Sequence, residues 1–276
     1  MILADAVPGT HPTFQICGST LCKFNTDTII SSAIAIALTM IIVLGVARMV
    51  RTDGGPPGKV QMVLELFLSY TRGLIKDYVA PDADFILPLA ATIFLFILIA
   101  NWIDFFPLTQ PLIPANADVN LTFAMSITVI AVVQWYSVRV LGWRGYFRRY
   151  TKPFELGIVA RTVYVPLNVI EEIAKPISLA LRLFGNIFGG LVMVYLLTLA
   201  WNAFVGSSVI QDALSPAWIV FLVIWKLFDV FLIGTIQAFI FMLLTIIYFG
   251  MAREGLEEEH HASAAHATTE LRSEAT

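Results

Sequence analysis

The stretch "ISLALRLFGNIFGGLVMVYLLTLA", residues Ile177–Ala200, contains one charged side chain, that of Arg182. A helix needs about 20 mostly apolar residues to cross the hydrocarbon core of a bilayer, so the stretch predicts a transmembrane helix. The guanidinium stays protonated at physiological pH, and a cation at the centre of such a helix costs at least about 2.5 kcal/mol. Arg182 is about equally far from both ends of the longer apolar segment Pro166–Ala200, which makes it hard for its side chain to reach the interface. The sequence therefore favours a functional role for this cation, on an ion pathway or against an anionic partner.

The composition places the whole chain in the membrane class. Of its 276 residues, 58% are hydrophobic and 13% are charged, whereas soluble domains carry about 25% charged residues. We expect an all-α integral membrane protein with five transmembrane helices. The apolar runs that are long enough are Ile29–Met49, Phe85–Phe106, Leu121–Leu141, Pro166–Ala200 and Ala217–Met251.

The last two runs are too long for upright spans. Each has 35 residues, which reach roughly 52 Å, against about 30 Å of hydrocarbon. We therefore expect two long, strongly tilted helices, with Pro166 and Pro176 as positions for a kink. Between the first two spans, Val60–Tyr78 mixes apolar and charged residues, which predicts an amphipathic helix lying along the interface.

Lysine and arginine in the loops indicate the orientation of the chain. Arg48–Lys76 carries five of them and Arg139–Arg161 carries six, whereas Pro107–Asn120 and Asn202–Pro216 carry none. With both basic regions in the cytoplasm, the N-terminus lies outside and the C-terminus inside. The chain then divides into an extracytoplasmic segment (1–27), a membrane domain (28–252) and a polar, disordered cytoplasmic tail (253–276).

We expect neither a metal site nor a cofactor site. Cys17 and Cys22 in "CGSTLC" either form a local disulfide, if this end faces an oxidising compartment, or remain two free thiols. His260 and His261 are interpreted as solvated side chains of the tail. We expect no cleavable signal peptide, since "MILADAVPGT" has no basic side chain.

Polar residues form one stripe on the fourth apolar run. Spacings of three and four residues put them on one face of a helix. They are Glu171, Lys175, Ser178, Arg182, Asn186 and Gly189, with Glu172 beside them. The predicted topology puts the two acids and the lysine on the inner side of the arginine, where the acids are equally consistent with a wet interface. The glycines of "GNIFGG" allow close packing, either of a partner helix or within the chain.

Further polar residues lie on the outer side. Asp229 and Gln237 interrupt the last apolar run, with Asp229 eight residues, roughly 12 Å, outward of Gln237. Lys226, three residues before Asp229, can form an ion pair with it. Asp118 and Asn120 stand at the outer end of the third span. The sequence thus predicts two half-paths of polar groups separated by a central cation, with no continuous line of acids between them.

The segments around these residues resemble a known family. "KPISLALRLFGNIFGG" and "IQAFIFMLLTIIYFGMA" closely resemble the a subunit of F-type ATP synthases, and "NTDTIISSAIA", "NWIDFFPL" and "ADVNLTFAM" resemble it in the same order. The resemblance covers about Asn25–Glu259, and "WKLFD" and "EGLEEEHH" look most like actinobacterial members. It implies a proton-translocating stator subunit of the bacterial plasma membrane, without catalytic activity of its own. The implied partners are a rotating ring of c subunits, each with a membrane carboxylate, b-type peripheral stalk subunits and the lipid bilayer, with no nucleic acid and no cofactor.

The resemblance also implies roles for single residues. Arg182 matches the arginine that holds a passing ring carboxylate ionised and blocks direct proton leak between two half-channels. Gln237 matches the glutamine that faces it, and Asn186 matches the asparagine one turn beyond it. Asp118 and Asn120 match polar residues of the outer half-channel.

The chain departs from the family pattern on the outer side. Leu191 stands where many relatives carry Glu, and Val230 stands where some carry His. Asp229 is the only acid in the outer half of the last helix, so it is our candidate for the outer proton carrier.

Two other classes of function are weighed against this one. A stand-alone secondary transporter or ion channel is the main alternative, and its signature would be internal repeats and a broken-helix site. The sequence shows neither. An intramembrane enzyme is disfavoured because the sequence has no GxSxG and no HExxH motif.

Overall fold

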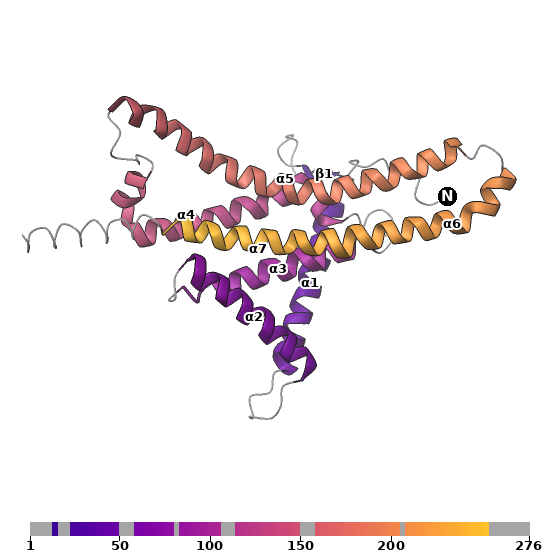
Figure 1. The fold of residues 1–276 in the computed structure, drawn as a ribbon, viewed down its shortest axis with the longest axis horizontal. Helices are drawn as coiled ribbons and strands as arrows, with labels where there is room; N and C mark the ends of the chain where they lie inside the picture. The colour runs from indigo at the N-terminus through magenta and orange to yellow at the C-terminus, as the bar shows by residue number, and fades with distance from the viewer. Residues whose placement is uncertain are drawn as a thin grey trace, which may run out of the picture.

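The computed structural model describes residues 13–15, 23–49, 58–79, 83–105, 114–149, 158–204 and 208–253. These residues form mainly long helices (Figure 1). The elements are β1 (Thr13–Gln15), β2 (Lys23–Asn25), α1 (Thr26–Met49), α2 (Lys59–Tyr78), α3 (Ile86–Ile103), η2 (Ala115–Ala117), α4 (Val119–Arg149), α5 (Ile158–Phe204), α6 (Ser208–Leu227), η3 (Phe228–Ile233) and α7 (Gly234–Met251).

The predicted fold class and the five spans are confirmed. Within the described residues, five helical segments are long and apolar enough to cross a membrane. They are Thr26–Arg48, Ile86–Ile103, Val119–Phe147, Val165–Ala203 and Leu214–Met251.

Two short strands precede α1. β1 pairs with β2 in antiparallel fashion, with Thr13 opposite Asn25. The sequence did not predict them, because three residues are too few for a readable alternation. Cys17 and Cys22 lie outside the described residues, as does the tail from residue 254, so both expectations remain predictions.

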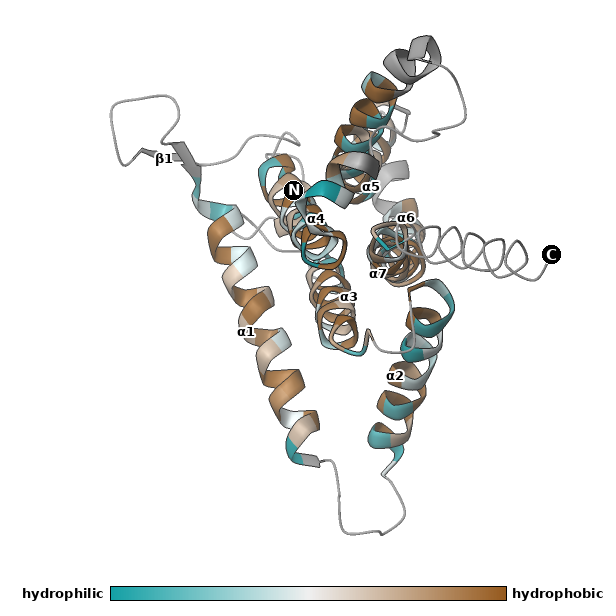
Figure 2. Ribbon diagram, turned by 90° about the vertical axis from the view of Figure 1, so that its left-hand side faces the viewer, coloured by the Kyte–Doolittle hydropathy of each residue, from teal (hydrophilic) through white to brown (hydrophobic). Residues whose placement is uncertain are grey.

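The helices run in two directions. α1 runs across the direction of α5 and α7 in Figure 1, and Figure 2 looks nearly along α3, α4 and α7 while α1 and α2 run across the view. α1 exposes large apolar side chains such as Met40 and Ile41, which suits a helix surrounded by lipid. A membrane that α1 crosses upright would be crossed obliquely by α5 and α7, so the two directions agree with the tilt expected from the lengths of the long helices.

α5 is longer than predicted. It has 47 residues, begins at Ile158 rather than Pro166, and contains both Pro166 and Pro176. Each proline removes one backbone hydrogen-bond donor, and α5 bends along its length (Figure 1). α4 breaks at Gly142, whose φ of 69° is a conformation that glycine adopts readily.

The last span differs from the prediction of one continuous helix over Ala217–Met251. It begins earlier, at Ser208, and η3 is a π-helical turn between α6 and α7. There the N–H of Gly234 donates to the carbonyl of Asp229, five residues earlier. Such turns are rare and often mark functional sites. The sequence of the turn, "FDVFLI", contains no proline or glycine that would signal it.

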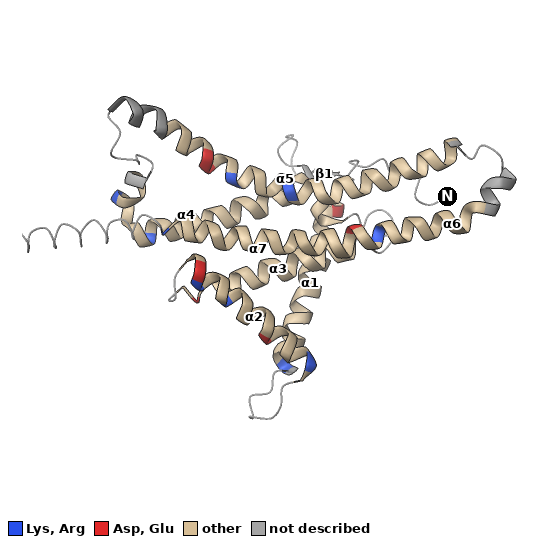
Figure 3. Ribbon diagram, viewed as in Figure 1, with Lys and Arg blue, Asp and Glu red and all other residues tan. Residues whose placement is uncertain are grey.

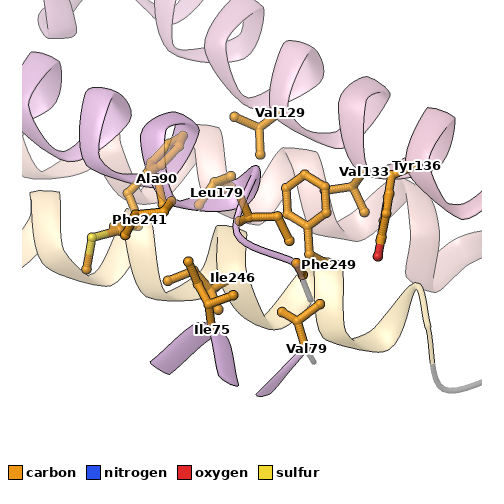
Figure 4. Packing of buried hydrophobic residues seen from close by; sticks show 14 of the residues in the cluster. Ile75, Val79, Ala90, Val129, Val133, Tyr136, Leu179, Phe241, Ile246 and Phe249 are labelled. Carbon is orange, nitrogen blue, oxygen red and sulfur yellow. The ribbon is translucent and has the colours of Figure 1, made fainter. Parts of the chain in front are cut away.

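The core lies where α2, α3, α4, α5 and α7 meet. Figure 4 shows Ile75 of α2 and Val79, the residue after α2, close to Ile246 and Phe249 of α7. The predicted amphipathic helix is therefore confirmed as a helix, α2, and it packs on α7 through one face. Its exposed side carries both charged residues, such as Glu65 and Lys76, and large apolar residues, such as Val63 and Leu66, so hydrophilic and hydrophobic positions alternate along it (Figure 2). Its position along the membrane interface remains a prediction.

Candidate functional site

Asp229 lies in the π-helical turn, and its carboxylate packs against α5. The residue is only 6% exposed. A Cβ atom added to Gly190 would collide with the Asp229 carboxylate, so this carboxylate fills space that only a glycine leaves free. We call this place the Gly190 notch. The next residue in α5 is the apolar Leu191. Asp229 therefore brings a carboxylate from the last span to a level of α5 where α5 has no acidic residue of its own.

Lys226 pairs with a different acid from the one its spacing suggested. Its Nζ lies 2.5 Å from Oδ2 of Asp104, the residue that follows α3. Both side chains are largely buried. The sequence predicted an i, i+3 ion pair between Lys226 and Asp229. Lys226 pairs with Asp104 instead, because the Asp229 carboxylate is directed into the Gly190 notch. Figure 3 shows acidic and basic residues close together where α6 leads into α7.

The C-terminal end of α3 contacts the last span on both sides of Asp229. Nδ2 of Asn101 donates to the carbonyl of Gly234 at 3.0 Å, and Oδ1 of Asn101 accepts a hydrogen bond from Nδ2 of Asn116 at 2.7 Å. Nε1 of Trp102 donates to Oγ1 of Thr235 at 3.3 Å. Together with the Asp104–Lys226 pair, these contacts bracket the π-helical turn. We call Asn101, Trp102 and Asp104 the α3 clamp.

Arg182 is exposed on α5 and has no ion pair with any residue in the described part of the chain. α5 and the last span run antiparallel (Figure 1). Arg182 comes eight residues before Gly190, and Gln237 comes eight residues after Asp229. Because Gly190 contacts Asp229, this register puts Arg182 and Gln237 at about the same level.

Two amide groups near this level lack acceptors. Among the described residues, neither Nδ2 of Asn186 nor Nε2 of Gln237 has a hydrogen-bond partner. Asn186 lies one turn from Arg182 on the same helix. A permanent cation and two unpaired amide donors form a set that suits an anionic group, which would gain charge-assisted hydrogen bonds there.

The inner acids form a cluster around Lys175. Its Nζ lies 3.3 Å from Oε1 of Glu171 and 3.1 Å from Oε1 of Glu172. Gln134 of α4 donates to Oε2 of Glu172 at 2.7 Å. The side chain of Glu171 is 62% exposed and that of Glu172 only 15%. A position at the water-exposed interface is therefore consistent with Glu171 but much less so with Glu172.

Two residues lie between this inner cluster and Arg182. Ser178 is exposed on the same face of α5. Tyr248 of α7 lies within electrostatic range of both Arg182 and Glu172. The inner half of the predicted stripe thus contains polar groups from both α5 and α7.

Asp118 and Asn120 form the start of α4. Oδ1 of Asp118 accepts hydrogen bonds from the backbone N–H and Nδ2 of Asn120, at 2.8 and 3.0 Å. Oδ2 accepts from Nδ2 of Asn25 at 2.5 Å and from Oγ1 of Thr28 at 2.6 Å. Asp118 is therefore the N-cap of α4 and also holds the start of α1.

We predict that Asp118→Ala destabilises the chain by about 2 kcal/mol, because it removes a helix cap and the hydrogen bonds that this buried side chain accepts. Asp118→Asn should lose less, since Asn also caps helices well. Denaturant unfolding of the detergent-solubilised complex measures both variants. Equal stability of Asp118→Ala and the unchanged chain would contradict the capping role.

The structure brings some predicted residues together and separates others. Asp229 meets α5, and Glu171 and Glu172 share Lys175. Asp118 contacts the start of α1, and its near neighbour Asn116 contacts Asn101 of the α3 clamp.

Several contacts at the site were missed by the sequence analysis: those of Asn101, Asn116, Gln134 and Gly190, and the Asp104–Lys226 pair. Polar residues in apolar helices were a usable signal for Asn101 and Gln134. Gly190 offered none beyond a general tendency to allow close packing.

Comparisons with known proteins agree on one family. The family model described as ATP synthase A chain matches residues 29–250. ATP synthase subunit a of Mycobacterium marinum is 40% identical, with 95% of this chain and 98% of the relative covered. The proteins of the same name from Acidothermus cellulolyticus and Mycobacterium tuberculosis are 37% and 38% identical. They cover 91% and 95% of this chain, and 86% and 98% of their own lengths.

Proposed function

The chain belongs to the ATP synthase A chain family, and from this membership we propose how its own residues move protons. It is a proton-translocating stator subunit of the ATP synthase membrane sector and a multi-pass bacterial membrane protein. Our proposal is that it forms two offset half-channels against a rotating ring of c subunits, with Arg182 as the barrier between them. It performs no catalysis by itself.

One observation carries this proposal. Arg182 is an exposed cation on a membrane-spanning helix, and it has no ion pair in the part of the chain that the structure describes. A cation in that position is costly unless a partner supplies an anion. A carboxylate on each ring subunit would be such an anion, and the unpaired amides of Asn186 and Gln237 support its binding at this level.

The outer half-channel ends at Asp229 in this proposal. A proton from the outside protonates Asp229, which passes it to the ring carboxylate that is leaving Arg182. The ring carboxylate is then neutral and can face lipid at low cost. Asp118 and Asn120 border the approach to this path, with Asp118 as an anchor that accepts hydrogen bonds from Asn25, Thr28 and Asn120.

The inner half-channel runs along α5. A ring carboxylate that approaches Arg182 from the other side loses its proton, because the cation favours the ionised form. Ser178, Lys175, Glu172 and Glu171 then conduct the proton to the cytoplasm. The membrane potential contributes about 2.3 kcal/mol per charge per 100 mV to this transfer.

The surroundings of the half-channels are also part of the proposal. The N-terminal segment 1–27 lies outside, 28–252 form the membrane domain, and 253–276 form a cytoplasmic tail. α2 lies along the inner interface with its charged face toward water. Subunits of the b type hold the chain against the rotation of the ring.

Co-purification tests the proposed partners. The full-length chain, tagged at its C-terminus and extracted mildly from its own membranes, should bring down c and b subunits in fixed ratio. The chain purified alone and placed in liposomes should move no protons, because each half-channel ends at the ring. Solute or proton transport by the chain alone would instead support the stand-alone transporter.

A further inference from the structure

The π-helical turn makes Asp229 sensitive to its neighbours. A turn with i→i+5 hydrogen bonds is less common and less stable than the α-helix on either side of it. The sequence "FDVFLI" has no residue that would enforce it. The turn must therefore be held by tertiary contacts, and the structure offers such contacts from α3 and from α5.

The first contact comes from α3. Asn101 is fully buried and donates from Nδ2 to the carbonyl of Gly234, the residue directly after the turn. Nδ2 of Asn116 donates a hydrogen bond to Oδ1 of the same Asn101 side chain. A Cβ atom on Gly234 would lie 3.2 Å from Cβ of Asn101, so backbone and side chain fit closely here. The amide of Asn101 thus fixes the end of the turn.

The second contact comes from α5. The Gly190 notch receives the carboxylate of Asp229, and the position of this carboxylate depends on the missing side chain. A methyl group at position 190 would collide with the end of a side chain, which can rotate away. The collision would therefore move the carboxylate rather than the backbone of α5.

We propose that Asn101 and Gly190 are positioning residues for the outer proton carrier. Asn101 holds the π-helical turn from α3, and Gly190 admits the carboxylate of Asp229 to the surface of α5. This inference rests on the proposed role of Asp229. Proton transfer depends steeply on geometry, and a displacement of about 1 Å can lower a rate about 100-fold.

The first experiment uses Gly190→Ala in the complete complex. In a helix, alanine is more favourable than glycine, so the stability of the complex should be unchanged or higher. Proton-driven ATP synthesis in membrane vesicles should nevertheless fall about 10- to 100-fold. A synthesis rate equal to that of the unchanged protein would overturn the role of the notch.

The second experiment uses Asn101→Ala with Ile97→Ala as its matched control. Ile97 lies one turn earlier on α3 and is fully buried in the core, so its truncation weakens the same helix without touching the π-helical turn. Asn101→Ala should lower ATP synthesis about ten-fold relative to Ile97→Ala. Equal losses in both variants would show that Asn101 acts through general packing, and the proposal would be wrong.

A third measurement does not depend on proton transfer. Asp229→Cys in a Cys17→Ser and Cys22→Ser background places a reporter thiol at the site. A charged methanethiosulfonate reagent, added from the outside to the assembled complex, should modify it at a rate that Asn101→Ala changes at least several-fold and that Ile97→Ala leaves alone. An unchanged rate in Asn101→Ala would overturn the positioning role. If the rate changes while Asp229→Asn still supports normal synthesis, the proposed function of Asp229 fails and the positioning stands.

Discussion

Arg182→Ala is expected to reduce proton-coupled ATP synthesis to the background level. Without the cation, a ring carboxylate that reaches the stator has no group that favours its ionised form. It keeps its proton or exchanges it directly between the half-channels. The flow of protons then no longer forces the ring to turn in one direction.

The same variant should still assemble. Arg182 is exposed and makes no ion pair with any described residue of this chain, so its removal leaves no buried partner without a counter-ion. Exposed substitutions of this kind usually change stability by no more than about 0.5 kcal/mol. The complex should therefore be recovered in normal amounts, with its c and b subunits.

Synthesis in energised vesicles and subunit content after mild extraction measure these two effects. Arg144→Ala is the matched control, because it removes another exposed arginine from a helix of the same chain and should retain near-normal synthesis. Coupled synthesis close to normal in Arg182→Ala would refute the barrier role.

Asp229→Asn is expected to slow proton uptake from the outside about 100-fold, the usual contribution of a positioned acid or base. The asparagine side chain has nearly the same shape, so it should still fit the Gly190 notch. It cannot bind and release a proton in the relevant range. The remaining rate should therefore lose its dependence on the outer pH.

Proton uptake across a series of outer pH values, at constant inner pH, measures this change. Asp84→Asn is the control, since Asp84 forms an exposed ion pair with Arg72, and such pairs contribute about 0–1 kcal/mol. An unchanged rate across the pH series in Asp229→Asn would remove Asp229 from the path.

The contrast between Asp118 and Asp229 shows that the type and position of a residue in the sequence do not determine its contacts. Both are acids that the predicted topology puts on the outer side, and the sequence does not show which neighbours either one contacts. In the structure Asp118 accepts four hydrogen bonds and caps α4, whereas Asp229 packs against a glycine of another helix. The difference lies in which neighbours each acid meets, and those neighbours are distant in the sequence.

The sequence by itself determined the five spans, the two long helices and the stripe that centres on Arg182. These features follow from hydrophobic length and helical period, which are local properties and need no knowledge of packing. The position of Arg182 in the stripe and its lack of an acid within one turn could also be read directly.

Only the tertiary structure decided which acid pairs with Lys226 and that a π-helical turn forms at Asp229. It also decided that Gly190 makes room for the Asp229 carboxylate. Lys226 has an acid three residues away on its own chain segment, yet it pairs with Asp104, the residue that follows α3. The turn at Asp229 exists because α3 and α5 hold it, not because its own residues favour it. Helical period assigns a residue to a face, but the choice of partner depends on how helices pack, and that depends on contacts between residues far apart in the chain.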